Sequence, residues 1–558
     1  MRIVLALCLG LAVGQALAAT YYVDCSAAGN GSGASESDPK NTFAGVTTGN
    51  ADVFYLRPDV TCAASKAMDA DAMITVGQND DSVTIDTYPG SAPCNEMTGE
   101  NCAILDGEGT VNIGLYGVNN DAWTVRNVVA RNFEYHNYRH WGTDTQNFTV
   151  SLENVWLDTT GPVADADATY STLTKGTCGI VARASNGPYK TDVTSDHLHT
   201  SGCTRLGFDH RWWVVHIARN YTSTSSGTDR VIGGHGLSAH PLSGDVTSAW
   251  TFRSGTCPGS DCVYSRAVVA AADDEQLIWD RQTSPNVKLQ RVADGDTTPD
   301  QGYFSVVSNT DIYVNFGYVP PTAGNGVRII RQPIQVDCFD CEFSGAQVQA
   351  GGSLEGSGFH ADDTSPMRCF RCYSHDNFGN GFYFNSTSQY WSGIKAGCFQ
   401  CIAADNGDAS QCTGASCGFG YYANGEADFV DSVAVNSLKE QFSVAGKFNT
   451  CGDIINTSAS ESPGYGYRFQ NDATSKCTLT AANAWENGIN YSGGSSGTTV
   501  DPDFLGGDLP TTAEDFRLHV GSALRRAGAC YLDTGCGYSG FAGNRGFVPR
   551  DVGPHQGQ

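Results

Sequence analysis

A five-residue motif recurs three times at nearly constant spacing in the second half of the chain. Each copy holds two cysteines on either side of a Phe and a variable residue, in Asp337–Cys341, Arg368–Cys372 and Gly397–Cys401. The second copy follows the first after 31 residues, and the third follows after 29. A unit of this length cannot bury its apolar side alone, whereas stacked units share a continuous core. The repeat therefore predicts a solenoid.

A second marker, a Gly followed by alternating aromatic residues, indicates that the repeated elements are strands. It begins at Gly358, Gly381, Gly466 and Gly488. Short alternating segments between turns rich in Asn, Asp, Gly and Ser are typical of strands rather than helices. We therefore expect an all-β chain.

The cysteine pairs of the repeat allow two interpretations. A C-x-x-C motif is common in zinc and redox sites. Residues three apart on a strand point to opposite faces, so one sulfur of each motif should face the core. We favour stacked cysteine columns, with some disulfides between coils, over a zinc site.

The other cysteines and the N-terminus predict export. Several of the 21 cysteines close short loops, namely Cys94/Cys102, Cys257/Cys262, Cys412/Cys417 and Cys530/Cys536. Such pairs are typical of disulfides formed in an oxidising compartment. Residues 1–18 combine Arg2, an apolar run and an A-x-A site at Ala16–Ala18, the features of a secretory signal peptide. We expect a secreted protein, extracellular or periplasmic.

The two ends of the mature chain carry segments that point to a known group of folds. They are Tyr21–Asp24, Asp52–Arg57, Asp501–Phe504, Asp515–Leu518, Gly521–Leu524 and Asp551–Pro554. These segments resemble the first and last coils of extracellular right-handed parallel β-helix proteins of the pectate-lyase-like superfamily, although Arg525 and Arg526 depart from the usual Ile-Asp pair. The resemblance implies a right-handed parallel β-helix formed by residues 19–244 and 326–558.

The coil rhythm fails between these two parts, in residues 245–325. Val263–Ser265, Leu277–Asp280 and Asp311–Val314 are typical of strands in a small antiparallel unit. Insertions on solenoids often lie on the binding face. We expect a small β subdomain that forms a wall of a cleft, the alternative being a surface feature without a role.

Charge excludes some functions. The chain has a formal net charge of −26 and no block of five basic residues. Nucleic-acid binding relies on neutralising phosphates, so we expect no nucleic-acid partner. No segment after the signal peptide has the ~18 apolar residues of a membrane span, so we expect no membrane partner. We also expect a monomer.

The densest group of cationic or titratable side chains in this acidic chain lies just before the insertion. Its members are His197, His199, Arg205, His210, Arg211, His216, Arg219, His235 and His240, with Trp212 and Trp213 among them. Elimination from a uronate chain needs a cation for the carboxylate, a base and a proton donor. We expect catalytic roles for His197, Arg205, His210, Arg211 and His235, and substrate binding by His199, Trp212, Trp213 and His240. The alternative for each His is a polar residue of a turn or the core.

Two local patterns in this region matter for mechanism. His197 and His199 are two residues apart, which places them on the same face of a strand. The segment Gly233–Ser238, which contains His235, is similar to the histidine motif of polygalacturonase-type glycoside hydrolases. Those enzymes also need carboxylates upstream, and the expected Asn-Thr-Asp and Asp-Asp are absent from the preceding coils.

A second constellation could bind a cation. It comprises His360, Asp362, Asp363, His375 and Asp376. Clustered Asp residues with turn carbonyls suit Ca²⁺, so Asp362, Asp363 and Asp376 are candidate Ca²⁺ ligands. Zinc bound by the two histidines is a weaker alternative, and Asx turns are the commoner use of such residues.

A third cluster, from Arg131 to Trp141, is rich in aromatic and basic residues. We expect Tyr135, Arg139 and Trp141 to bind sugar, the alternative being an aromatic-rich turn packed on a neighbouring coil. Taken together, the sequence predicts an enzyme that acts on an acidic polysaccharide, with lyase-type β-elimination on a uronate-containing glycan as the favoured reaction. A glycoside hydrolase and a non-catalytic adhesin or tailspike-like protein remain the alternatives.

Overall fold

The computed structural model describes most of the chain up to Asp501. The described residues are 18–77, 82–119, 122–142, 147–161, 175–183, 190–211, 214–228, 234–240, 242–245, 250–257, 262–267, 277–280, 287–293, 295–307, 311–317, 327–331, 334–348, 356–362, 367–385, 395–412, 417–445, 452–470, 477, 479–493, 497–499 and 501. Residues 1–17 of the expected signal peptide, Cys530/Cys536 and all but the first residue of the expected last coil lie outside them. None of the described residues belongs to a helix long and apolar enough to cross a bilayer.

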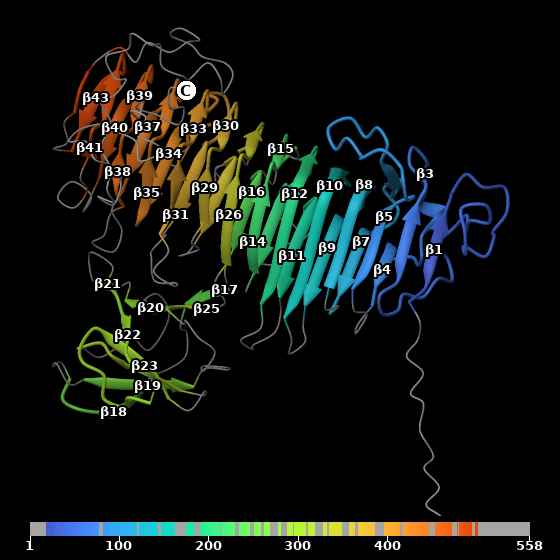
Figure 1. The fold of residues 1–558 in the computed structure, drawn as a ribbon. Coiled ribbons are helices and arrows are strands. Elements are labelled where there is room, and N and C mark those ends of the chain that lie inside the picture. Colours follow the sequence, from blue (N-terminus) through green and yellow to red (C-terminus); the bar gives the residue numbers. More distant parts are fainter. Residues whose placement is uncertain are drawn as a thin grey trace, which may run out of the picture.

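One long parallel sheet has twelve strands, each contributed by a different coil (Figure 1). Its strands, in spatial order, are β4 (Ala72–Val76), β7 (Ile113–Val118), β9 (His136–Gly142), β11 (Gly179–Arg183), β13 (Phe208–Arg211), β16 (Leu237–His240), β28 (Phe359–Asp362), β31 (Phe382–Asn385), β34 (Phe419–Asn424), β37 (Glu440–Val444), β40 (Tyr465–Phe469) and β43 (Ile489–Ser492). The chain leaves this sheet after each strand and returns one strand further along. Such a path is that of a parallel β-helix.

The second long sheet has 22 strands and forms the rest of each coil. They are β1 (Thr20–Val23), β2 (Val53–Leu56), β3 (Thr61–Cys62), β5 (Val83–Thr87), β6 (Ala103–Asp106), β8 (Ala122–Phe133), β10 (Phe148–Thr160), β12 (Thr191–Ser201), β14 (Val214–Arg219), β15 (Thr222–Thr224), β26 (Ile334–Phe339), β27 (Glu342–Ser344), β29 (Met367–Phe370), β30 (Tyr373–His375), β32 (Ala396–Phe399), β33 (Ile402–Ala404), β35 (Ala427–Val430), β36 (Val433–Val435), β38 (Ile454–Ile455), β39 (Ser458–Ser460), β41 (Leu479–Thr480) and β42 (Asn483–Trp485). A short 3-10 helix, Ala64–Lys66, joins β3 to β4.

Each coil turns a sharp corner within this second sheet, at a residue with positive φ. The corner residues stack in register and are Asn127, Asn154, His197, Asn220, Asp340, Arg371, Gln400, Asp431, Asn456 and Ala481, with φ between 49° and 59°. This left-handed backbone favours Asn and Asp among residues other than Gly. The corner interrupts the alternation of inward and outward side chains, which affects every motif that spans it.

The repeated cysteines show this effect directly. Cys338, Cys369 and Cys398 align in register on adjacent strands, which confirms the stacked column. The second cysteine of each motif is buried as well, so the prediction of one inward sulfur per motif is wrong. The residue directly before the second cysteine has the left-handed backbone of the corner. Because of this corner, the second cysteine points inward although it lies three residues after the first.

Aromatic side chains fill the interior of the C-terminal coils. Phe382, Tyr421, Phe442, Tyr467 and Tyr491 form one stack with ring centroids 4.7–5.4 Å apart. The Gly-aromatic marker therefore lies on strands of the twelve-stranded sheet, as predicted. Stacked rings of this kind add to the free energy gained from burying their apolar area.

The segment that interrupts the coils forms two small, mainly antiparallel sheets beside the stack of coils (Figure 1). One contains β17 (Leu242–Asp245), β25 (Val327–Arg331), β20 (Leu277–Asp280) and β21 (Val287–Lys288). The other contains β18 (Thr251–Ser254), β19 (Val263–Ala267), β24 (Asp311–Asn315), β23 (Tyr303–Val307) and β22 (Gln290–Arg291). Pairing of β17 with β25 closes the unit at its base, and Phe304, Ile312 and Val314 lie in its own small core.

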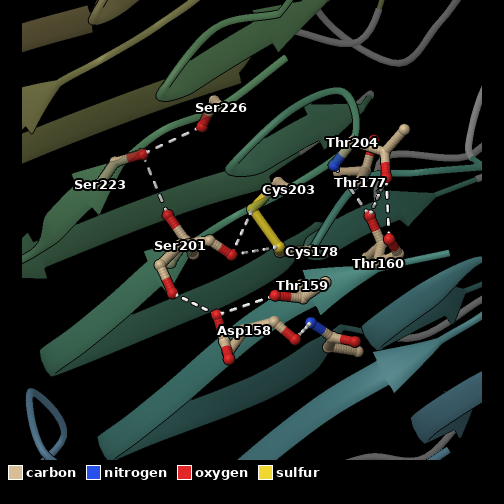
Figure 2. Close-up of a disulfide and its surroundings, with 12 residues drawn as sticks. Asp158, Thr159, Thr160, Thr177, Cys178, Ser201, Cys203, Thr204, Ser223 and Ser226 are labelled. Carbon is tan, nitrogen blue, oxygen red and sulfur yellow. Dashed lines mark hydrogen bonds between the residues drawn. A yellow bond between two sulfur atoms is a disulfide. The ribbon is translucent and has the colours of Figure 1, made fainter. Parts of the chain in front are cut away.

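Disulfides join short loops and neighbouring coils. The expected pairs Cys94–Cys102, Cys257–Cys262 and Cys412–Cys417 are confirmed. Cys178–Cys203 instead links points 25 residues apart on neighbouring coils. Figure 2 shows this disulfide among hydroxyl groups, where Ser201 donates to Asp158 at 2.6 Å and Thr204 donates to the Thr160 carbonyl at 2.8 Å.

Candidate active site

The fold distributes the dense cationic segment over both faces of the twelve-stranded sheet. Neighbouring residues of a strand point to opposite faces, and Phe208 of β13 belongs to the core of the coil. His210 therefore points inward with Phe208, whereas Asp209 and Arg211 point outward. A single stretch of sequence thus supplies two separate groups of side chains.

The inward side chains form a continuous series of hydrogen bonds inside the coil. His210 Nε2 lies 2.7 Å from His216 Nδ1, and His210 Nδ1 lies 2.8 Å from the Ser238 carbonyl oxygen. The Ser195 hydroxyl lies 2.8 Å from His216 Nε2. Burial lowers the pKa of His210 to about 4 and that of His216 well below its usual value, so both are neutral at pH 7. His210 was expected to be catalytic, but strand alternation places it inside the coil, where a polymer cannot reach it.

His197 and His199 do not share a strand face, contrary to the prediction. His197 adopts φ 52° at the corner position, which divides β12 at that point. Its exposed side chain pairs with Asp196 at 3.0 Å. His199, beyond the corner, stacks on Trp156 with centroids 5.5 Å apart and lies 3.2 Å from the Glu96 carbonyl oxygen. The corner thus gives His197 a structural position, and His199 packs against the Cys94–Cys102 loop.

The outward group is centred on Asp209. Register aligns Asp209 with Ser238 on β16, His360 on β28 and Tyr383 on β31. Asp209 forms an ion pair with Arg211 and accepts a hydrogen bond of 2.9 Å from the Ser238 hydroxyl. Asp209 and Ser238 have no exposed surface, and His360 is only 4% exposed. This row therefore combines buried charge with outward direction, and the outer face of a solenoid sheet is where a long substrate could lie.

His235 completes this row from the turn before β16. Its ring centroid lies 4.1 Å from that of His360, and its Nδ1 accepts the Ser357 backbone N–H at 3.1 Å. In the neutral ring the proton is then on Nε2, and this atom has no hydrogen-bond partner among the residues that the structure describes. Burial, reinforced by His360 and Arg205, lowers the pKa of His235 well below its usual value. Burial lowers that of His360 to about 3, against the opposing effect of Asp209.

The glycines around His235 are needed for close contact between coils. A Cβ at Gly234 would lie 1.6 Å from the Arg205 carbonyl oxygen, and one at Gly236 would lie 2.6 Å from the Gly358 carbonyl oxygen. Only glycine allows these backbones to approach so closely. The Gly-His-Gly pattern thus has a structural cause that is independent of any hydrolase mechanism.

Arg205 brings a second guanidinium to the group. Its side chain is 1% exposed. Burial, together with the charge of Arg211 and against that of Asp209, lowers its pKa to about 10, so it remains cationic at pH 7. Two arginines and two neutral histidines therefore lie around one carboxylate.

The third predicted cluster lies on the same outer face. Arg139 on β9 aligns with Asp209 through Ile180 on β11, and Trp141 aligns with Arg211 through Ala182. The Arg139 guanidinium lies over the rings of Tyr116 and Trp141, at 5.3 and 5.1 Å. The backbones of Arg139 and Asp209 are two strand spacings apart, and each spacing is about 4.8 Å. Tyr135, in the turn before β9, instead packs against the Lys175 ammonium group at 4.2 Å.

The predicted Ca²⁺ constellation is divided by the fold. Asp362 ends β28 in the twelve-stranded sheet, whereas Asp376 lies at a turn after β30 with φ 50°. His375 lies between Glu342 and Asp376, at 3.0 and 2.7 Å. Asp362 and Asp376 therefore belong to segments of different sheets, and the predicted Ca²⁺ site stays a prediction. Within the described residues, the one group with metal-ligand spacing is Cys338, Cys341 and Cys372.

Some predicted residues cannot be placed and others were missed. Trp212, Trp213 and Asp363 lie outside the described residues, as do the side chains of His240 and Asp362. Sequence reasoning missed Asp209, Ser238 and Tyr383. The alternation of inward and outward side chains along β13 could have identified Asp209 as an outward residue. This alternation is hard to recognise in the sequence, because the inward position 210 holds a polar histidine.

Comparisons with known proteins yield only distant similarity. No family model and no curated protein matches the chain. Among solved structures, a rhamnogalacturonan lyase is 12% identical with a TM-score of 0.39, covering 90% of this chain and 97% of that chain. The pectate lyase Pel9A is 11% identical with a TM-score of 0.36, covering 96% of each chain. A GH136 lacto-N-biosidase from Eubacterium ramulus is 9% identical with a TM-score of 0.35, covering 85% of this chain and 68% of that chain. The parallel β-helix assignment rests on the sheets described above.

Proposed function

We propose that the chain is an enzyme that acts on an acidic polysaccharide outside the cytoplasm, and that it cleaves a uronate-containing glycan by β-elimination. The observation that carries the proposal is the outward group of Arg205, Asp209, Arg211, His235 and His360. It supplies cationic side chains for a carboxylate and uncharged imidazoles for proton transfer, beneath the outer face of the twelve-stranded sheet. The six disulfides that join two described cysteines favour an oxidising compartment.

In the proposed reaction, Arg205 and Arg211 neutralise the uronate carboxylate, which makes the neighbouring C5 proton more acidic. His360 removes this proton and returns it to the leaving glycosidic oxygen. The C5–H and C4–O bonds break, a double bond forms between C4 and C5, and the released chain carries the proton. Atoms and charge therefore balance without an added reagent. The Nε2–H of His235 donates a hydrogen bond to the substrate.

A buried histidine with a lowered pKa is a weak base, but a bound substrate would raise its pKa. Burial disfavours the imidazolium in the free protein, whereas a negative charge nearby favours it. A bound uronate therefore raises the pKa of His360 towards the working pH. The histidine becomes an effective base only when the right substrate is present.

Aromatic residues on the same outer face extend the proposed substrate path. Tyr383 and Tyr422 stack 4.6 Å apart beyond His360, and Trp141 and Tyr116 lie on the other side of Asp209. Sugar rings pack well on aromatic faces, and Arg139 adds a cation for another carboxylate. These residues would serve as binding subsites on both sides of the cleaved bond.

A glycoside hydrolase is the second candidate, because Asp362 follows His360 two residues later on β28 and would supply a second carboxylate besides Asp209. Inverting hydrolysis needs two carboxylates roughly 6.5–9.5 Å apart. Asp209 and Asp362 belong to strands separated by β16 and are offset along the strand direction, so their backbones lie about 12 Å apart.

The test is incubation of the purified protein with a panel of uronate-containing polysaccharides, with and without EDTA. Elimination creates a double bond that absorbs in the ultraviolet, and we expect this signal from the wild type and its loss in His235→Asn. Arg371→Gln, a surface change at a corner, serves as the control and should retain the signal. New reducing ends without absorbance would indicate hydrolysis, and neither signal would leave a binding protein. Sensitivity to EDTA would support the expected Ca²⁺.

A further inference from the structure

Six cysteines form two adjacent columns inside the C-terminal coils. The first column is Cys338, Cys369 and Cys398, and the second is Cys341, Cys372 and Cys401. All six are buried. The pair Cys338–Cys341 is a disulfide, whereas the other four carry thiols. The three cysteine pairs occupy equivalent corners of three consecutive coils.

The three corners have the same backbone and side-chain geometry. The residue before each second cysteine has φ 56°, 56° and 59° at Asp340, Arg371 and Gln400. Each second cysteine places its sulfur near the carbonyl oxygen two residues earlier, at 3.6, 3.5 and 3.5 Å. The sulfurs of Cys372 and Cys401 also each lie 3.4 Å from the carbonyl oxygen of the first cysteine one coil earlier. A backbone that closes one disulfide is therefore present three times.

The four thiols already lie against one another. The sulfurs of Cys369 and Cys372 are within hydrogen-bond reach, and so are those of Cys398 and Cys401. Each sulfur also lies within reach of its equivalent on the next coil, so the contacts alone allow pairing within or between coils. Disulfides need Cα atoms about 4.4–6.8 Å apart, and the equivalent pair Cys338–Cys341 has 6.1 Å. Four buried thiols in contact are unusual beside the six disulfides among the described residues, because an oxidising compartment converts such pairs.

The next coil shows where the series ends. Ser432 occupies the position of the second cysteine, after a corner residue, Asp431, with φ 52°. Its hydroxyl donates to the Val430 carbonyl at 3.0 Å and to the Cys398 carbonyl at 3.4 Å. These are the same two acceptor positions that the cysteine sulfurs use. The corner is thus a general feature of the coils, and cysteine pairs occupy three consecutive copies of it.

We propose that the native protein contains a ladder of three disulfides, in which Cys369–Cys372 and Cys398–Cys401 close in the same way as Cys338–Cys341. Each closure removes two protons and two electrons from a pair of thiols. A disulfide oxidant, such as glutathione disulfide or an oxidised thiol exchange protein, accepts them and is released as two thiols. Closure takes place during folding, before the neighbouring coils cover the sulfurs.

The ladder would hold these coils together covalently, which apolar packing alone does not do. Each rung ties the two strands that meet at a corner, so a coil cannot open at that point without breaking a covalent bond. The three rungs stack along the axis over Cys338 to Cys401. The proposal depends on oxidising folding and is independent of the proposed enzyme activity.

Mapping the thiols of the native protein by mass spectrometry tests this. The secreted protein is denatured with iodoacetamide present and digested with trypsin without reduction. We expect no carbamidomethyl group on any of the four cysteines. Trypsin cleaves after Arg371, so the peptide of Cys369 should be found linked to the peptide that begins at Cys372. Cys398 and Cys401 have no Lys or Arg between them, so their peptide should be lighter by two hydrogens for that disulfide.

Three results would overturn the proposal. Alkylation of the four cysteines would show that they are thiols. A link between the peptides of Cys369 and Cys398 would show pairing between coils instead. Zinc in the purified protein by elemental analysis, with the four thiols alkylated after its removal, would show a metal site. Cys338 and Cys341 serve as the internal control, because their disulfide should survive in every case.

Discussion

Two histidine pairs, one inside the coil and one at the outer face of the twelve-stranded sheet, show how position changes the meaning of a residue. The inner pair, His210 and His216, and the outer pair, His235 and His360, are all buried with lowered pKa values. In the inner pair, all four ring nitrogens have a partner within the coil. In the outer pair, Nε2 of His235 has none among the described residues. Burial and pKa alone therefore do not distinguish a core histidine from a reactive one.

The surroundings of the two pairs differ as well. The inner pair lies among apolar side chains, with Phe208 5.2 and 5.6 Å from its two rings. The outer pair lies beside Asp209, Arg205 and Arg211. A charged neighbourhood is costly to bury unless it is paired, and here Asp209 is paired with Arg211.

The largest expected effect is a loss of enzyme activity when a histidine of the outer pair is replaced. Replacing His360 with Asn should reduce kcat by about 10²–10⁴-fold, the usual contribution of a general base, because the amide cannot accept the C5 proton. Steady-state turnover on the best polysaccharide of the panel measures this. Wild-type turnover in the variant would remove His360 from the proposed mechanism, and circular dichroism would verify that the fold is unchanged.

The inner pair should respond in stability rather than turnover. His216→Ala leaves Nε2 of His210 without its partner and creates a cavity, which together should lower the free energy of unfolding by about 2–4 kcal/mol. Denaturant unfolding gives this value. Turnover per folded molecule should stay within about two-fold of wild type. A large loss of turnover with unchanged stability would contradict the division between the pairs.

Both pairs should make the protein less stable in acid. Burial holds the folded pKa of His360 at about 3 and that of His210 at about 4, below the unfolded value of about 6.5. Above about pH 6.5 neither state binds the proton, so these groups add no pH dependence. As pH falls below that value only the unfolded state gains the proton, and each histidine lowers stability by about 1.4 kcal/mol per pH unit.

The acid effect can be assigned by substitution. His360→Asn should reduce the slope of unfolding free energy against pH by about 1.4 kcal/mol per unit between the unfolded pKa and the folded one. Denaturant unfolding at several pH values measures the slope. An unchanged slope would mean that His360 is protonated in the folded protein as readily as in the unfolded chain.

The smallest effect is expected at the corner. Asn fits the left-handed backbone of His197 better than His does, and neighbouring coils already place Asn154 and Asn220 there. His197→Asn should therefore change the free energy of unfolding by less than about 0.5 kcal/mol and leave turnover unchanged. A loss of activity would restore the catalytic role that the sequence predicted for this residue.

Sequence reasoning was reliable where a pattern depends on stacking. The cysteine motifs and the Gly-aromatic segments predicted strands in register, because every coil must present the same side chains to its neighbours. The short cysteine loops were predictable because few partners lie so close in sequence. The cationic region around Arg205 and Arg211 was also found, since its composition differs from the rest of an acidic chain.

Sequence reasoning failed where alternation breaks. Both cysteines of a motif face inward because Asp340, Arg371 and Gln400 have left-handed backbones, and His197 and His199 are separated by the same kind of corner. Asp209 was missed because His210 occupies an inward position and disguises the period. Asp362 and Asp376 were grouped by nearness in the chain, although the coil places them in segments of two different sheets.

The sequence by itself determined that the chain stacks short strands into coils, because only stacking buries repeats that have one apolar side. It also determined which segment carries the charged groups. Only the tertiary structure decided which face each of these side chains occupies. The reason is physical: alternation along a strand is local, but a left-handed corner or a close contact between glycines resets it, and neighbouring coils determine where those resets are tolerated. Asp209, His235 and His360 meet because three coils are in register, and no single segment contains that information.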